Sequence, residues 1–250
     1  SPKNIVYRDL DEVIEEIKFI KTIAKQKDYI ICLLDEAFII NRTRVIEFCN
    51  LLLSQKLSIK WACFSRIGCV DAELLKKMAR SGCFAVSYGI ESGSNKILKK
   101  IKKGFTIEQA LEDLFLTKKY ISEVQAGFIY GFPFETPKDF LKTLIINQAL
   151  QLKGFLTGVL PLTPVNNSEL YRQYAKTLRF SPSDRTAGWD WDTPRLPKEC
   201  VNLVKKHPII FANFYHFNFS RLKKILLFFQ HNPNRKLPVS IDIFKQIVLE

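Results

Sequence analysis

The feature that most constrains the fold is an alternation of short apolar runs with longer amphipathic segments, repeated about five times along the chain. The runs have the length of strands and lack the polar alternation of a half-wet sheet, as buried parallel strands do. They lie at residues 29–34, 59–64, 84–86, 124–130 and 155–160. This pattern predicts an α/β fold with a parallel sheet and right-handed crossovers, either open or closed as a barrel.

Residues that favour helix N-termini stand before the amphipathic segments. Thr136 is the clearest, because Pro137 and Asp139 follow it in the first turn, where proline and a carboxylate are favoured. A short basic helix is expected over residues 96–103. The other predicted N-caps are Asp9 or Asp11, Asn41, Asp71 and Thr106.

Polar side chains follow every predicted strand. Because the carboxyl ends of parallel strands meet at one edge of a sheet, these side chains are expected on one rim, where α/β barrels place their active sites. In chain order they are Asp35 and Glu36, Ser65 and Arg66, Glu91 and Ser92, Gly131 with Glu135, and Thr163.

The stretch over residues 82–94 is central, because Glu91 stands there among glycines that let a backbone approach a ligand closely. Glu91 could instead cap the following helix. Asp35 and Glu36 have the same alternative, and Lys103 could be a solvated charge at a helix end. These alternatives stay open at the level of sequence.

The character of the chain changes near residue 170. Residues 181–198 are rich in Pro, Asp and Trp, and the remainder is apolar, aromatic and basic with helical periodicity. We therefore predict a core barrel over residues 1–170, followed over residues 171–250 by a loop or lid and a mostly helical C-terminal extension.

The composition is basic, with 38 Lys and Arg against 25 Asp and Glu and a net charge of +13. This suits nucleic acid or an anionic membrane surface, but the basic residues are scattered along helix faces, as in a soluble protein from a lysine-rich proteome. Six cysteines occur without a C-x-x-C pair, which favours a reducing, cytoplasmic location. Cys32, Cys63 and Cys83 lie in or beside apolar runs, as small core residues do.

Four groups of residues resemble the core of the radical SAM superfamily. Each is weak alone, but four in order at matching points of the alternation are specific. The similarity runs from about residue 2 to about residue 171, and the nearest subgroup carries a cobalamin-binding domain ahead of the core. The groups are Asp35-Glu36-Ala37-Phe38 with Asn41 and Arg44; Trp61 with Cys63, Ser65 and Arg66; Gly89-Ile90-Glu91-Ser92-Gly93-Ser94 with Lys103-Gly104; and Gly131-Phe132-Pro133-Phe134-Glu135-Thr136.

The resemblance implies a partial (β/α)6 TIM-like barrel, here lacking its first β/α unit. Enzymes of this family use a 4Fe-4S cluster to cleave S-adenosylmethionine reductively to a 5'-deoxyadenosyl radical. Their cobalamin-binding members methylate or rearrange unactivated carbons. The resemblance also implies an electron donor such as flavodoxin or ferredoxin and a small-molecule or lipid-like substrate.

The resemblance also implies contacts with S-adenosylmethionine. The backbone around Asp35 and Glu36 would meet the amino group of the ligand. Glu91, with Ser92 next to it, would bind the same end, and Lys103 would pair with the carboxylate. The remaining implied contacts are Ser65 and Arg66 beside the ribose or carboxylate, and Ile129, Leu162 and Thr163 along the adenine.

The sequence departs from the family pattern at the cluster loop. The C-x-x-x-C-x-x-C segment is absent, and Cys63 and Cys69 have the wrong spacing and position to replace it. In the family this loop precedes the point where the chain begins, so we expect a truncated piece that does not assemble the cluster by itself. Any cobalamin domain would also lie upstream. Residues 165–168 also replace an expected aromatic-Pro-Gly-Thr.

Three functions compete. The first is a radical S-adenosylmethionine enzyme, with or without cobalamin. The second is a tRNA methylthiotransferase, which the charge and residues 133–136 permit, although no small β-barrel nucleic-acid domain is visible after residue 170. The third is a non-catalytic barrel kept as a binding module, which the missing cysteines favour. The substrate cannot be read from the sequence.

Overall fold

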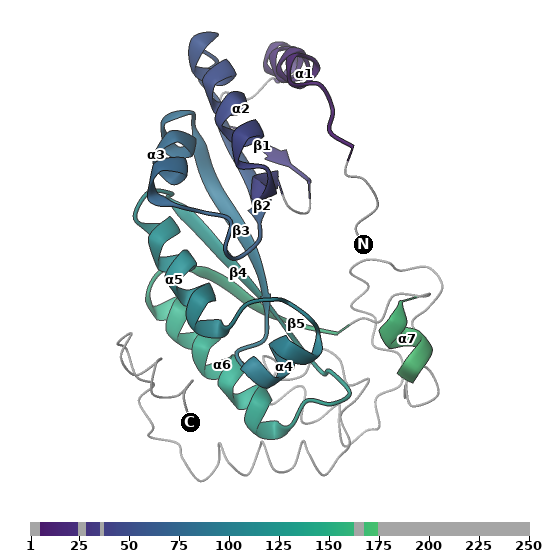
Figure 1. The fold of residues 1–250 in the computed structure, drawn as a ribbon. Helices are drawn as coiled ribbons and strands as arrows, with labels where there is room; N and C mark the ends of the chain where they lie inside the picture. Colours follow the sequence, from purple (N-terminus) through teal and green to yellow (C-terminus); the bar gives the residue numbers. More distant parts are fainter. Residues whose placement is uncertain (1–5, 25–28, 36–37, 163–167, 175–250) are drawn as a thin grey trace. The chain divides into compact units, whose positions relative to one another are not determined.

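The computed structural model describes residues 6–24, 29–35, 38–162 and 168–174, in which strands and helices alternate (Figure 1). Five strands form one sheet in the order β1-β2-β3-β4-β5, and β2 pairs in parallel with both β1 and β3. The predicted parallel α/β fold is therefore confirmed, while the extension predicted over residues 171–250 lies outside the described residues beyond residue 174. The elements are α1 (Leu10–Ile23), β1 (Ile30–Leu33), η1 (Phe38–Ile40), α2 (Arg42–Ser54), β2 (Lys60–Ser65), α3 (Ala72–Arg80), β3 (Cys83–Glu91), α4 (Asn95–Lys100), α5 (Ile107–Lys118), β4 (Glu123–Tyr130), α6 (Pro137–Leu152), β5 (Leu156–Pro161) and α7 (Glu169–Tyr174).

The chain packs as two compact bodies, and the boundary between them crosses β3 and β4. The first body comprises residues 1–89 and 108–126. The second comprises residues 90–107 and 127–250, of which the described part ends at residue 174.

The core of the first body is built around Trp61, which is fully buried. Its ring meets Phe38 and Phe48 edge to face, with centroids 5.9 and 5.4 Å away. The indole N–H donates to the Ser81 carbonyl oxygen at 3.1 Å, so the polar edge of the ring is satisfied inside the core. Helices α2 and α3 pack against each other in this body (Figure 1).

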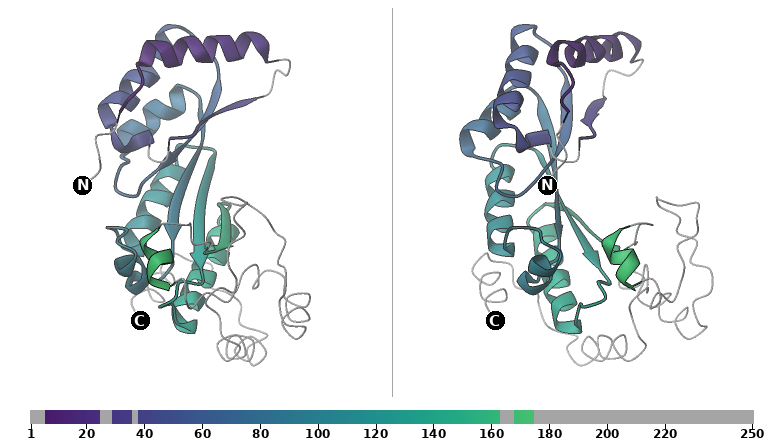
Figure 2. Two further views of the ribbon diagram at one scale, coloured as in Figure 1. Left: turned by 90° about the vertical axis from the view of Figure 1, so that its right-hand side faces the viewer. Right: turned by 45° about the vertical axis from the view of Figure 1, so that its right-hand side comes forward.

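The second body has its core between α6 and β5, which pack together (Figure 2). Tyr130 and Phe140 lie with ring centroids 5.3 Å apart, and Leu144 and Val159 pack against them. The start of α6 is thereby fixed beside the carboxyl end of β4. Among the helices of the described chain, none combines the length and the apolarity needed to cross a bilayer.

Most of the predicted helix caps are confirmed. Asp9, Asn41 and Asp71 cap α1, α2 and α3, and each side chain accepts a hydrogen bond from a backbone N–H of the first turn. Thr136 caps α6, where Asp139 completes a reciprocal capping box. Such caps typically contribute about 1 kcal/mol each, and they locate the starts of these helices.

Strand β3 is longer than the sequence predicts. We expected a strand over residues 84–86, but β3 continues to Glu91. Burial alternates through Val86, Tyr88 and Ile90, so the polar and small residues between them occupy the opposite face. The alternation was hidden by the glycines and serines of the same stretch.

The burial of the cysteines differs in part from the prediction. Cys63 and Cys83 are buried, as small core residues, but Cys32 is exposed. The prediction for Cys32 was wrong because alternate residues of β1, Ile30 and Cys32, lie on its exposed face.

Candidate functional site

Glu91 ends β3 in an unusual backbone conformation. Its φ of 71° lies in the left-handed region, which costs a residue other than glycine on the order of 1–3 kcal/mol. The alternative that Glu91 caps the next helix is wrong, because Ser94 occupies the N-cap position of α4. A strained carboxylate at the carboxyl end of a strand is a typical mark of a functional site.

Lys103 returns to Glu91 through the turn that ends α4. Lys102 adopts a φ of 57°, and the Lys103 N–H donates to the Leu98 carbonyl oxygen at 3.1 Å, as in a Schellman motif. The Lys103 ammonium nitrogen lies 3.2 Å from Glu91 Oε1, and the two side chains are 27% and 23% exposed. Lys103 is therefore a partner of Glu91 and not a solvated charge.

We call Ser92, Gly93 and Ser94 the post-β3 turn, which is buried against α6. The Gly93 N–H donates to Thr143 Oγ1 at 2.9 Å, and the Ser92 and Thr143 hydroxyl oxygens lie 3.3 Å apart. The Ser94 hydroxyl donates to Asp139 Oδ1 at 2.7 Å. Two side chains one helical turn apart on α6 thus hold all three residues of the turn.

The approach of this turn to α6 requires glycine at position 93. A Cβ on Gly93 would lie 2.8 Å from the Cα of Thr143 and 2.9 Å from the carbonyl carbon and oxygen of Lys142. These are backbone atoms, which cannot move aside as the end of a flexible side chain can. The absence of a side chain therefore permits the short Gly93–Thr143 hydrogen bond.

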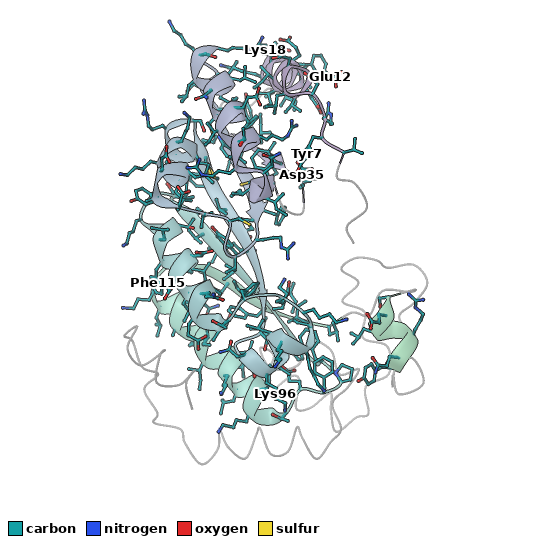
Figure 3. The ribbon with its side chains drawn as sticks, viewed as in Figure 1. Tyr7, Glu12, Lys18, Asp35, Lys96 and Phe115 are labelled. Atoms are coloured by element: carbon teal, nitrogen blue, oxygen red, sulfur yellow. The ribbon has the colours of Figure 1, made fainter. Side chains whose placement is uncertain are left out.

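Asp139 links the post-β3 turn to the start of α6. Its Oδ2 accepts from the N–H and the hydroxyl of Thr136 at 3.0 and 2.6 Å, and Lys96 of α4 lies 3.5 Å away (Figure 3). Burial alone would raise the pKa of Asp139, but the hydrogen bonds from Thr136 and Ser94 outweigh it and hold the pKa below its ordinary value. Asp139 is therefore ionised at neutral pH.

The segment between β4 and α6 folds around its own carboxylate. Gly131 has a φ of 91°, and its N–H donates to Glu135 Oε2 at 2.7 Å. The Glu135 N–H donates in turn to the Phe132 carbonyl oxygen at 2.9 Å. Glu135, expected among the polar strand ends, is buried and bonded to the backbone of its own loop.

In the first body, Asp35 follows β1 and is exposed (Figure 3). Arg66 follows β2 and is also exposed, whereas the buried Ser65 hydroxyl donates to the Arg66 carbonyl oxygen at 3.1 Å. The next loop is tied to α5, because the Gly68 N–H donates to Asp113 Oδ2 at 2.6 Å. The roles predicted for Asp35, Ser65 and Arg66 remain predictions.

The remaining predicted residues lie in or near the second body. Ile129 and Leu162 are both half-buried, and the Leu162 N–H donates to the Tyr130 carbonyl oxygen at 2.8 Å. Glu36 and Thr163 lie outside the described residues. Contacts with adenine therefore remain a prediction for this segment.

Sequence reasoning missed the part that α6 has in this site. Asp139 was expected only as a first-turn carboxylate, and Thr143 had no expected role. Their spacing of four residues, which places both on one face of a helix, was the available signal. The structure also turns the Ser92 hydroxyl toward Thr143, although we had expected it near the ligand.

Among the described residues, no group of three or more His, Cys, Asp or Glu side chains is arranged to hold a metal ion. Burial raises the pKa values of Cys49 and Cys83, so both remain neutral thiols at neutral pH. An iron–sulfur cluster is held by several cysteine side chains close together, and the described residues contain no such arrangement.

Comparison with known proteins places these observations in a family. The family model described as "Radical SAM superfamily" matches residues 1–145. The chain is 32% identical over 143 residues to an uncharacterized methyltransferase of Pyrococcus horikoshii, covering 57% of this chain and 31% of the relative. It is 33% identical over 149 residues to a putative methylthiotransferase of Methanocaldococcus jannaschii, covering 56% and 32%. The chain thus spans about a third of the length of these relatives.

A solved structure shares the fold. It is the radical S-adenosylmethionine methyltransferase TsrM from Kitasatospora setae with cobalamin and a [4Fe-4S] cluster bound. The TM-score is 0.58 at 17% identity, and the match covers 72% of this chain and 37% of TsrM.

Proposed function

The chain belongs to the radical SAM superfamily, and we propose that its second body binds the charged end of S-adenosylmethionine through Glu91 and Lys103. The observation that carries this proposal is the partly exposed ion pair of these residues, 3.2 Å apart at the strained end of β3. An ion pair that keeps part of both charged groups accessible can open to admit a ligand with charges of both signs.

The ligand has the complementary chemistry. The methionine end of S-adenosylmethionine carries an ammonium and a carboxylate, and its ribose carries hydroxyl groups. Glu91 would accept hydrogen bonds from the ammonium or the hydroxyls, and Lys103 would pair with the carboxylate. Ile129 and Leu162 are proposed as apolar contacts for the adenine, because both belong to the second body and are half-buried.

When bound, S-adenosylmethionine supplies either a methyl group or, after one-electron reduction, a 5'-deoxyadenosyl radical. TsrM binds both cobalamin and a [4Fe-4S] cluster, and we propose the same cofactors for the intact protein. The described residues do not fit the cluster, so their proposed part is to bind and orient S-adenosylmethionine.

Methyl transfer is the reaction that we favour, because a relative 32% identical to this chain is a methyltransferase by name. Methylthio transfer to RNA is the second candidate, supported by the relative named a putative methylthiotransferase at 33% identity. Supplying the intact protein with S-adenosylmethionine labelled in its methyl group distinguishes them. Label in small molecules favours the first reaction, and label in the RNA fraction favours the second.

Binding is tested by titration calorimetry of the full-length protein, purified anaerobically, with S-adenosylmethionine. Glu91→Ala and Lys103→Ala are each expected to weaken binding at least about tenfold, because each leaves one charge of the pair without its partner. Glu112→Ala and Lys99→Ala are matched controls, since they remove the same charges from exposed positions of α5 and α4. Wild-type affinity in both the Glu91 and Lys103 variants would refute the site.

A further inference from the structure

We infer that Thr143 of α6 is a positioning residue that orients the Glu91 carboxylate for S-adenosylmethionine. This inference rests on the proposed function. Thr143 acts through the post-β3 turn, because its hydroxyl accepts from the Gly93 N–H and lies 3.3 Å from the Ser92 hydroxyl, and these are the two residues that follow Glu91.

The left-handed backbone of Glu91 has to be imposed by its surroundings. A φ of 71° is unfavourable for a residue other than glycine, and within a structured segment it persists because the surrounding contacts hold the chain there. Before Glu91, Ile90 is buried with 0% exposure, and after it the Ser92 side chain is equally buried. The hydroxyl of Thr143 joins the second of these anchors to α6.

The Thr143 hydroxyl makes its hydrogen bonds away from water. The side chain is 0% exposed, and its oxygen also lies 3.4 Å from the Asp139 carbonyl oxygen of its own helix. If this hydroxyl were lost, the Gly93 N–H would be buried without its acceptor. Because Gly93 packs so close to α6 that even a Cβ would meet its backbone within 3 Å, the turn could recover a partner only by moving away, and Glu91 would move with it.

Asp139, one helical turn before Thr143 on α6, also holds the post-β3 turn in place. It holds Ser94 at 2.7 Å while its other oxygen closes the capping box of α6. The start of α6 and the position of Glu91 are therefore coupled through two side chains on one helix face. Thr143 gives the cleaner test, because valine keeps its shape and removes only the hydroxyl.

The test is a double-mutant cycle on affinity for S-adenosylmethionine, measured by calorimetry on the anaerobically purified full-length protein. Thr143→Val is expected to weaken binding about fivefold, the effect of one lost buried hydrogen bond. Thr143→Ser, which keeps the hydroxyl, is expected to bind within about twofold of wild type. In a Glu91→Ala background, Thr143→Val is expected to cause no further loss, because its effect passes through Glu91.

Thr117→Val is the matched control. Thr117 is also 0% exposed, and its hydroxyl lies 2.7 Å from that of Tyr88 in the first body. The Thr117→Val substitution removes an equally buried hydroxyl and leaves the contacts of the post-β3 turn in place. We expect Thr117→Val to lower the melting temperature and to leave the affinity unchanged.

Two outcomes overturn the inference: unchanged affinity in Thr143→Val, or an equal loss with and without Glu91. If Thr143→Val does not fold, Ser94→Ala takes its place, because it releases the post-β3 turn from Asp139. Its loss of affinity for S-adenosylmethionine must then also disappear in a Glu91→Ala background. If Glu91→Ala binds normally, this inference fails, and if Lys103→Ala binds normally as well, the proposed function fails with it. If only the Glu91 variant is weakened, this inference fails and the proposed function stands.

Discussion

The loops after β2 and β3 follow neighbouring strands of one sheet and are held in different ways. The post-β3 turn is buried and bonded to two side chains of α6. In the post-β2 loop, defined as Arg66–Val70, residues 66 and 68 are exposed, and a hydrogen bond to Asp113 ties it to α5. The strained Glu91 is next to the densely bonded turn, which indicates that hydrogen bonding is concentrated where a conformation has to be imposed.

The largest expected effect compares one glycine of each loop. Gly93→Ala should lower the free energy of unfolding by about 3 kcal/mol, because the added Cβ meets the backbone of α6 within 3 Å. Gly68→Ala should cost only about 1 kcal/mol, since Gly68 has a φ of 85° but nothing within 4 Å of the new Cβ. Urea unfolding of both variants measures the difference. Equal losses would show that the two loops are packed alike.

A smaller effect concerns the carboxylate that serves the post-β3 turn. Asp139→Asn should lower the free energy of unfolding by about 2 kcal/mol at neutral pH, because an amide cannot accept from all the donors around it. The pKa of Asp139 is lowered in the folded protein, so its contribution is complete above the unfolded pKa of about 3.9. It is lost as the pH falls through the folded pKa. Urea curves at decreasing pH should show the difference from wild type shrinking in acid, and a constant difference would contradict this role.

The smallest effect concerns Asp113, the carboxylate of α5 that holds the post-β2 loop. Burial raises the pKa of Asp113, and the Gly68 N–H opposes this rise without cancelling it. The sign is therefore reversed: the contribution of Asp113 is complete below its unfolded pKa of about 3.9 and is lost as the pH rises through the folded value.

Asp113→Asn, which keeps an acceptor for Gly68, should therefore stabilise the protein by up to about 0.5 kcal/mol at neutral pH. This advantage should disappear in acid. The same urea series measures it, with Asp139→Asn as the comparison. A loss of stability at neutral pH, as expected for Asp139→Asn, would show that the two carboxylates have the same role.

The helix caps and the strand–helix alternation were predictable because they depend on residues close together in the sequence. Asn41, Asp71 and Thr136 each bond within the first turn that follows them. The helix expected over residues 96–103 was placed too late at its end, because α4 ends at Lys100 and Lys102 adopts the left-handed conformation. A lysine carries no sequence signal for that conformation.

The contact between the post-β3 turn and α6 was not predictable from such rules. Gly93 and Thr143 are 50 residues apart, and which face of α6 meets the turn depends on how the helix packs. Glu91 was found because glycines surround it. Its pairing with Lys103 was not foreseen, since both residues had been assigned to the ligand and not to each other.

At position 91, the residue that is best for stability differs from the residue that supplies the carboxylate. Glycine fits a φ of 71° without strain, so Glu91→Gly relieves the backbone while deleting the carboxylate. A library randomised at this position and sorted only for heat resistance should therefore drift toward glycine or asparagine. Sorting the same library for ligand capture should restore the acid, and the gap between the two outcomes would report how much stability the chain gives up for this side chain.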